Sequence, residues 1–300
     1  MTLYTHADSN VRKTWLYLGG FLIFVILIGL LVSYYLDSYA ILLIVVVFSV
    51  LTSFFSYWYS DKIVLAIAGA SPIEKKDSPE LYRIVENLCI TAGLPLPKIY
   101  IIEEQQPNAF ATGRSKEHAV VAVTKGLLSR LDRSELEGVI AHELSHIGNR
   151  DALLQTIVVV MAGIVVLLVD FFFRISFWGG FGRRNSREGK GGAVLLAISL
   201  IAIILAPLFA QLIKLAISRK REFLADADGA LLTRYPEALA SALEKISQDL
   251  TPMKRASNST AHIYISSPFK GKEGQSWITK LFMTHPPVEE RIRALRGMKV

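Results

Sequence analysis

The chain has 300 residues and a mass of 33.3 kDa, enough for one large domain or two small ones. Hydrophobic residues make up 52% of it and charged residues 20%, and this apolar composition excludes a disordered chain and a fibrous repeat. The net charge is +7. Because the cations flank apolar runs, we expect a lipid bilayer rather than a nucleic acid as the partner of this charge.

Four uncharged stretches indicate membrane spans: 14–36, 38–60, 152–169 and 191–213. A helix needs about 20 apolar residues to cross about 30 Å of hydrocarbon. The first two stretches are predicted to be transmembrane helices, and the first is too long to be the core of a cleaved signal peptide. The third is short and the fourth contains Pro207, so these two form either a second transmembrane pair or a re-entrant or interfacial hairpin.

Basic residues near the ends of the spans predict the orientation. Arg12 and Lys13 precede the first span, whereas the link to the second offers only Asp37. The N-terminus and the polar segment 61–151 are therefore expected on the cytoplasmic side. The link 170–190 is basic, which favours the cytoplasm, whereas two further crossings would put it outside; this conflict stays open.

The polar segments carry the signals of a small domain of helices and strands. A helix is predicted over 78–92, starting at a capping serine followed by proline. Asp132 and Glu135 are spaced as a capping box, which starts a second helix that ends at about residue 148. Strands are expected at 98–102 and 119–123, joined by the polar link 103–118. The last part of the chain, 214–300, is expected to be mainly helical.

The sequence His-Glu-Leu-Ser-His at 142–146 lies in the second of these helices. His142 and His146 are four residues apart, so they share one helix face and can reach one cation. Glu143 lies beside the first histidine, where it can contact a metal-bound water without being a ligand. The spacing therefore predicts two ligands of a catalytic zinc site and its general base.

A catalytic zinc site takes three protein ligands, so the third must come from elsewhere in the chain. Glu222 and Asp226 are also four residues apart on one helix face. One carboxylate could bind the metal while the other orients a histidine. The alternative is an acidic face that pairs with Arg219 and Arg221, and spacing does not decide between them.

Together these motifs resemble the HtpX-type membrane zinc metalloproteases, relatives of the CAAX prenyl proteases. The resemblance covers nearly the whole chain: two N-terminal spans, HELSH at 142–146, a two-span insertion, REFLADADGA at 221–230 and THPPVEERI at 284–292. It implies one Zn²⁺ per chain and the following residue roles. The implied zinc ligands are His142, His146 and Glu222, the general base is Glu143, and Asp226 supports a ligand from outside the coordination shell. The implied substrate-binding residues are Asn108, Ala109 and Phe110, and His285 and Arg291 are implied to support catalysis.

The expected fold is an α-helical membrane protein with α+β elements: four hydrophobic spans and a gluzincin-like cytoplasmic zinc metalloprotease domain with a small β-sheet and a HExxH helix. The expected parts are a membrane anchor (1–60), the first half of the protease domain (61–151), a transmembrane or membrane-associated hairpin (152–217) and the second half of the protease domain (218–300). We expect a multi-pass protein of the bacterial cytoplasmic membrane. By resemblance, it cleaves membrane-protein or peptide substrates on the cytoplasmic side, as quality control of misfolded or damaged proteins.

Three other functions have less support in the sequence. A zinc-stabilised membrane scaffold or chaperone would have no need of a general base at Glu143. A transporter would carry charges within its spans, whereas these stretches are uncharged. A prenyl-peptide protease by kinship would need more spans to enclose a chamber.

Overall fold

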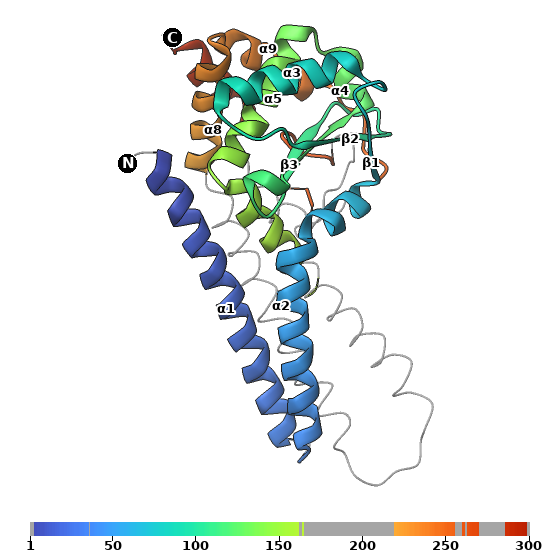
Figure 1. The fold of residues 1–300 in the computed structure, drawn as a ribbon, viewed down its shortest axis with the longest axis vertical. Coiled ribbons are helices and arrows are strands. Elements are labelled where there is room, and N and C mark those ends of the chain that lie inside the picture. The colour runs from blue at the N-terminus through green and yellow to red at the C-terminus, as the bar shows by residue number, and fades with distance from the viewer. Residues whose placement is uncertain are drawn as a thin grey trace.

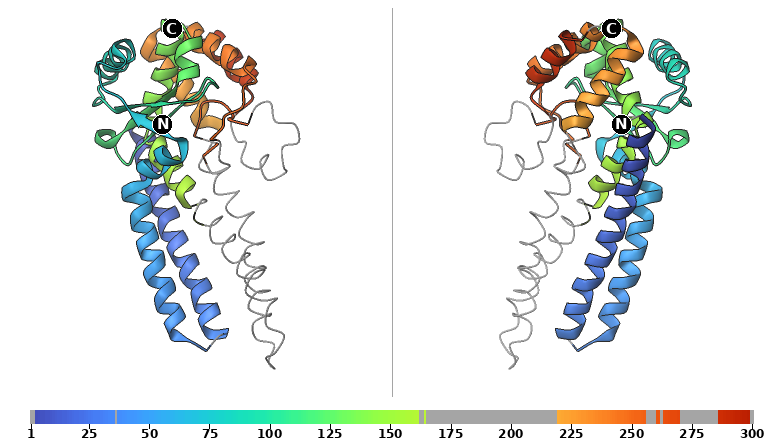
Figure 2. Two further views of the ribbon diagram at one scale, coloured as in Figure 1. Left: turned by 90° about the vertical axis from the view of Figure 1, so that its right-hand side faces the viewer. Right: turned by 90° about the vertical axis from the view of Figure 1, so that its left-hand side faces the viewer.

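The computed structural model of the chain describes residues 3–35, 37–161, 164, 219–255, 260–261, 263–269 and 286–298. Two long helices, α1 (Leu3–Tyr35) and α2 (Tyr39–Ala68), form an antiparallel hairpin that extends away from a domain of mixed helices and strands (Figure 1). The N-terminus lies at the domain end of this hairpin, and the α1–α2 link lies at the far end. Figure 2 shows the same two-part shape from both sides.

The helical hairpin has the character expected of the first two spans. Residues Ala7–Leu30 and Leu42–Ala68 are long and apolar enough to cross a membrane, and most of their surface is not covered by protein. Exposed apolar side chains such as Leu16, Leu43 and Ile44 would be costly in water and suit a bilayer. Helix α2 continues past the predicted end of its span because its last two turns enter the domain core.

Only part of the predicted hairpin 152–217 is described. Residues Asp151–Met161 form a helix whose side chains are buried against α1 and the sheet. Apart from residue 164, the rest of the third stretch, the basic link and the fourth stretch lie outside the described residues. Two of the four predicted spans are thus found as helices of the required length, and the other two remain predictions.

A four-stranded mixed sheet lies at the centre of the domain. Its strands are β1 (Ala70–Pro72), β2 (Lys98–Ile102), β3 (Ala109–Thr112) and β4 (Val120–Thr124), in the order β1-β2-β4-β3. The central pair β2–β4 is parallel and the two outer pairs are antiparallel. The expected strand at 98–102 is confirmed, and the strand expected at 119–123 starts one residue later. Strand β3 lies inside the predicted polar link 103–118. All four of its residues are buried, so the polar alternation that marks a half-exposed strand is missing.

Helices cover this sheet on the side away from the hairpin (Figure 1). The predicted helix over 78–92 is α3 (Pro79–Ala92), and a short α4 (Lys125–Arg130) follows β4. The capping box is confirmed at the start of α5 (Arg133–Gly148): the Asp132 carboxylate accepts from the Glu135 N–H at 2.9 Å, and the Glu135 carboxylate accepts from the Asp132 N–H at 2.9 Å. The described parts of the C-terminal segment contain α8 (Arg219–Thr233), α9 (Pro236–Gln248) and α11 (Val288–Arg296).

Glycines set how closely these helices approach α5. A Cβ on Gly138 would lie 2.9 Å from the backbone nitrogen of Leu239 in α9, and a Cβ on Gly229 would lie 3.0 Å from the backbone nitrogen of His142. Both separations are shorter than ordinary van der Waals contact. The absence of a side chain at Gly229 therefore lets α8 lie against α5 at the level of the histidine motif.

Candidate metal centre

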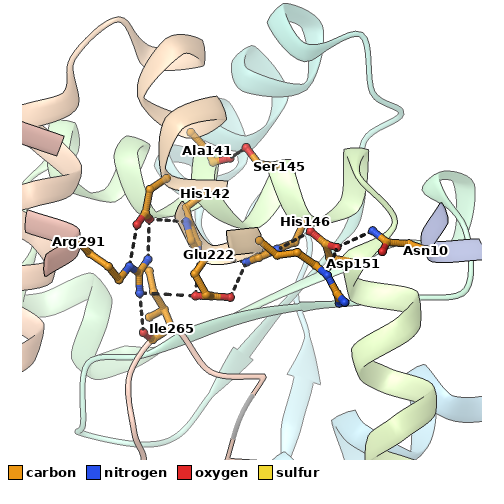
Figure 3. Close-up of polar contacts among 11 residues, drawn as sticks. Asn10, Ala141, His142, Ser145, His146, Asp151, Glu222, Ile265 and Arg291 are labelled. Carbon is orange, nitrogen blue, oxygen red and sulfur yellow. Dashed lines mark hydrogen bonds and ion pairs between the residues drawn. The ribbon is translucent and has the colours of Figure 1, made fainter. Parts of the chain in front are cut away.

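Helices α5 and α8 bring the predicted metal ligands together. His142, Glu143 and His146 come from the middle of α5, and Glu222 and Asp226 come from the first two turns of α8. All five side chains are buried, with at most 6% of each residue exposed. Figure 3 shows His142, His146 and Glu222 converging on one point.

The spacing of the ligand atoms fits a tetrahedral metal. The two Nε2 atoms of His142 and His146 are 3.2 Å apart, and Glu222 oxygens lie 3.6 Å from His146 Nε2 and 4.0 Å from His142 Nε2. Ligands at about 2.0–2.2 Å from a tetrahedral zinc are roughly 3.3–3.6 Å from one another. Two imidazole nitrogens and one carboxylate also form a ligand set that zinc uses in hydrolytic enzymes. The residues present therefore fit one zinc ion.

Each histidine has a carboxylate on the side of its ring away from this point. Nδ1 of His142 lies 2.9 Å from an oxygen of Asp226, in a bent contact, and Nδ1 of His146 lies 3.4 Å from an oxygen of Asp151. A carboxylate at Nδ1 holds the proton on that nitrogen and leaves the Nε2 lone pair for a metal. With both protons on Nδ1, two lone pairs face each other, an arrangement that a shared cation stabilises.

Arg291 lies behind the two carboxylates of α8. Its guanidinium is fully buried and donates to both oxygens of Asp226, at 2.8 Å and 2.6 Å. One of its nitrogens lies 3.7 Å from Glu222. Burial alone would raise the pKa of Asp226, but the charge and hydrogen bonds of Arg291 lower it to about 2. Arg291 thus keeps Asp226 ionised. Its predicted partner in catalysis, His285, lies outside the described residues.

Glu143 and His146 have shifted proton affinities. Burial raises the pKa of Glu143 to about 7, while a hydrogen bond from the Ala111 backbone acts against that rise. Burial acts to lower the pKa of His146, but Asp151 and Glu222 outweigh it and raise the pKa to about 9. The carboxylates around His146 therefore favour a positive charge on or next to its ring. A glutamate with a pKa near 7 can both accept and return a proton at neutral pH.

The predicted substrate-binding residues lie at the start of edge strand β3 and are fully buried. The Asn108 side chain donates to the Ser266 carbonyl at 2.8 Å and accepts from its N–H at 3.3 Å. The Ala109 carbonyl accepts from the N–H of Ile265 at 3.0 Å, and Phe110 packs edge-to-face on Tyr264. Residues 264–266 thus lie along this part of the strand edge, and the role of the three residues in substrate binding stays a prediction.

Asp151 is the residue of this site that the sequence did not single out. Helix α5 ends at Gly148, Arg150 adopts a left-handed conformation with φ of 57°, and Asp151 begins the next helix. This reversal brings Asp151 back beside His146. The only signal in the sequence was an acidic residue between the histidine motif and the next apolar run.

Comparisons with known proteins identify the family of this chain. Residues 75–299 match the model of Peptidase family M48. The chain is 47% identical over 299 residues to the "Protease HtpX homolog" of Thermoanaerobacter pseudethanolicus, covering 99% of this chain and 98% of that one. It is 49% identical over 279 residues to the "Protease HtpX homolog" of Pyrococcus furiosus, covering 92% and 93%. The crystal structure of S. mikatae Ste24p matches with a TM-score of 0.49 at 19% identity, covering 98% of this chain and 66% of that one. The chain belongs to peptidase family M48 and is a metallopeptidase.

Proposed function

We propose that the chain is a zinc-dependent endopeptidase that hydrolyses peptide bonds in cytoplasmic parts of misfolded or damaged membrane proteins. The observation that supports this most directly is Glu143. Its carboxylate is buried on α5, on the residue that follows the proposed ligand His142. A structural zinc site has no need of a proton acceptor at this position.

The proposed mechanism assigns each residue one task. His142, His146 and Glu222 hold the zinc, which supplies a Lewis acid that polarises the scissile carbonyl and acidifies water. Glu143 takes the proton of the attacking water and passes it to the leaving amine. Either His285 or Arg291 is proposed to stabilise the charge that develops on the carbonyl oxygen. For Arg291 the described contacts with Asp226 and Glu222 also support a second task, which is to hold the α8 carboxylates in place.

We propose that the substrate binds as an extended strand along the outer edge of β3, between Asn108 and Gly113. Main-chain hydrogen bonds at a strand edge make few demands on side chains, so this mode gives the broad specificity that quality control requires. Because Ile265 already donates to the Ala109 carbonyl, a peptide that uses this carbonyl has to displace the 264–266 segment.

The proposed location is the bacterial cytoplasmic membrane, with the protease domain in the cytoplasm. In this orientation, a cysteine at the exposed Lys76 of the domain reacts with an impermeant thiol reagent only from the cytoplasmic side. A cysteine at the exposed Tyr39, at the start of α2, reacts only from the opposite side. Both substitutions are made with Cys89→Ala, which removes the only native thiol. Labelling of both positions from the same side contradicts the proposed topology.

The function is tested by measuring zinc content and cleavage of a membrane-protein substrate for wild type and Glu143→Gln, purified side by side. Glu143→Gln keeps the shape of the side chain and removes its proton affinity. We expect near-stoichiometric zinc in both proteins and cleavage by the wild type alone. Zinc in both proteins and cleavage by neither, after reconstitution in lipid, favours the zinc-stabilised scaffold instead.

A further inference from the structure

A second buried network lies on the opposite side of the metal centre from Arg291. The carboxylate of Asp151 contacts three side chains: His146 Nδ1 at 3.4 Å, Asn10 Nδ2 at 2.6 Å and Arg221 Nε at 3.7 Å. All four residues are buried, with at most 8% of each exposed. Asn10 belongs to α1, the first membrane helix. Figure 3 shows the line of contacts from Asn10 through Asp151 to His146.

We propose that Asp151 is a positioning residue for the ligand His146, and that Asn10 of the membrane anchor holds Asp151 in place. The inference rests on the proposed zinc site. It adds that this site is supported from two sides, by Asp226 behind His142 and by Asp151 behind His146. It also makes helix α1 part of the metal centre and not only an anchor.

The contacts of His146 support a positioning role for Asp151. Its Nδ1 faces Asp151, while its Nε2 lies 3.2 Å from His142 Nε2 and 3.6 Å from Glu222. A carboxylate that accepts the Nδ1 proton fixes the tautomer and the orientation of the ring and makes Nε2 a stronger ligand. Without Asp151, the imidazole could turn or carry its proton on Nε2, and both changes weaken metal binding.

The contacts of Asn10 support its role in holding Asp151 in place. Its amide nitrogen donates to the Asp151 carboxylate at 2.6 Å and to the Asn149 carbonyl at 3.0 Å. These two acceptors lie on either side of Arg150, whose left-handed backbone is disfavoured for any residue with a side chain. One amide group therefore holds both ends of the reversal that brings Asp151 back to His146.

The simpler alternative is that Asn10 and Asp151 only fasten α1 to the domain. Both interpretations predict that the metal-free protein loses stability when either residue is replaced. They differ in what happens to metal binding. A fastening leaves zinc affinity unchanged, whereas a positioning residue changes zinc affinity and the environment of the bound metal.

The experiment uses the full-length chain in detergent and compares wild type, Asp151→Asn, Asp151→Ala, Asn10→Ala and Thr14→Ala. Thr14 is the matched control, because it is also buried on α1, and within the described part of the chain its hydroxyl donates to the Asn10 backbone carbonyl at 2.9 Å and makes no hydrogen bond with Asp151. Three quantities are measured: zinc affinity by competition with a chelator, the visible absorption spectrum after cobalt substitution, and the melting temperature of the metal-free protein. Asp151→Asn keeps the shape of the side chain, so it remains informative if the alanine variant does not fold.

We expect Asp151→Asn and Asp151→Ala to weaken zinc binding by roughly 10- to 100-fold and to alter the cobalt spectrum. Asn10→Ala should weaken binding in the same direction by a smaller factor, and Thr14→Ala should leave it unchanged. Wild-type affinity and spectrum in the Asp151 variants, whatever their melting temperatures, overturn the inference. A change in the Asp151 variants without one in Asn10→Ala overturns the part played by α1. Failure of the wild type itself to bind zinc would instead refute the proposed function.

Discussion

Replacing Arg291 by methionine removes the charge that keeps Asp226 ionised in the interior. Asp226 and Arg291 are both buried, and the guanidinium makes two hydrogen bonds to the carboxylate, at 2.8 Å and 2.6 Å. Removing one partner of such a buried pair costs about 3–5 kcal/mol, because the other charge is left without compensation. In a protein of this size each kcal/mol lowers the melting temperature by roughly 2–4 °C. We therefore expect Arg291→Met to lower it by roughly 6–20 °C.

The matched control is Arg296→Met on the same helix. Arg296 also pairs with two carboxylates, those of Glu237 and Glu244, each at 2.9 Å, but its side chain is 45% exposed. Exposed ion pairs contribute little because water screens the charges, so this variant should melt within a few degrees of wild type. The assay is thermal unfolding of the metal-free proteins in detergent. Equal shifts for the two variants would refute the reasoning from burial.

A double variant separates the ion pair from simple loss of packing. Asp226→Asn removes the charge that Arg291→Met leaves behind, so the two changes together should cost less than the sum of the single changes. Additive losses would mean that the two side chains are not coupled and that the damage of Arg291→Met comes from repacking alone.

Three further predictions concern the helices around the metal centre. Gly229→Ala should weaken zinc binding, because its Cβ would press on the His142 backbone. Gly148→Ala is the control and should leave zinc binding unchanged, because its Cβ would meet Leu94 at an ordinary distance of 3.9 Å. Equal zinc affinities of the two variants would contradict the close approach of α8 to α5. Glu222→Ala should lose zinc that Glu143→Gln retains, and unchanged metal content would exclude Glu222 as a ligand. Burial raises the pKa of Cys89 to about 11, so at pH 8 a thiol reagent should react only with unfolded protein, and rapid labelling of the native chain would refute this.

Local signals in the sequence predicted the elements whose ends are determined by a few neighbouring residues. The helix that becomes α3 has proline in its first turn and a left-handed glycine after its last residue, and α5 starts with a capping box. Strand β2 is a short β-branched and aromatic run between prolines and a charged link. These features determine structure through hydrogen bonds and backbone angles within one or two turns, so they can be read without knowing the rest of the fold.

Features that depend on distant contacts could not be predicted from local sequence patterns. Strand β3 is formed from Ala, Phe, Ala and Thr, and its pairing with β4 and burial by other elements make it a strand. The same applies to the site. The histidine spacing indicated two ligands. The position of Asp151, however, depends on a left-handed turn after α5 and on a hydrogen bond from Asn10 of α1. Neither contact has a fixed spacing in the sequence.

The proposed metal centre is divided between α5, near the middle of the chain, and α8 and α11, which come later. During synthesis the two histidines and Glu143 therefore leave the ribosome well before Glu222, and Arg291 is the last of these residues to emerge. A nascent chain carries two of the three proposed zinc ligands and an unfinished support around them. On the proposed assignments, the complete site forms only after α8 and α11 have been synthesised and have packed against the rest of the domain.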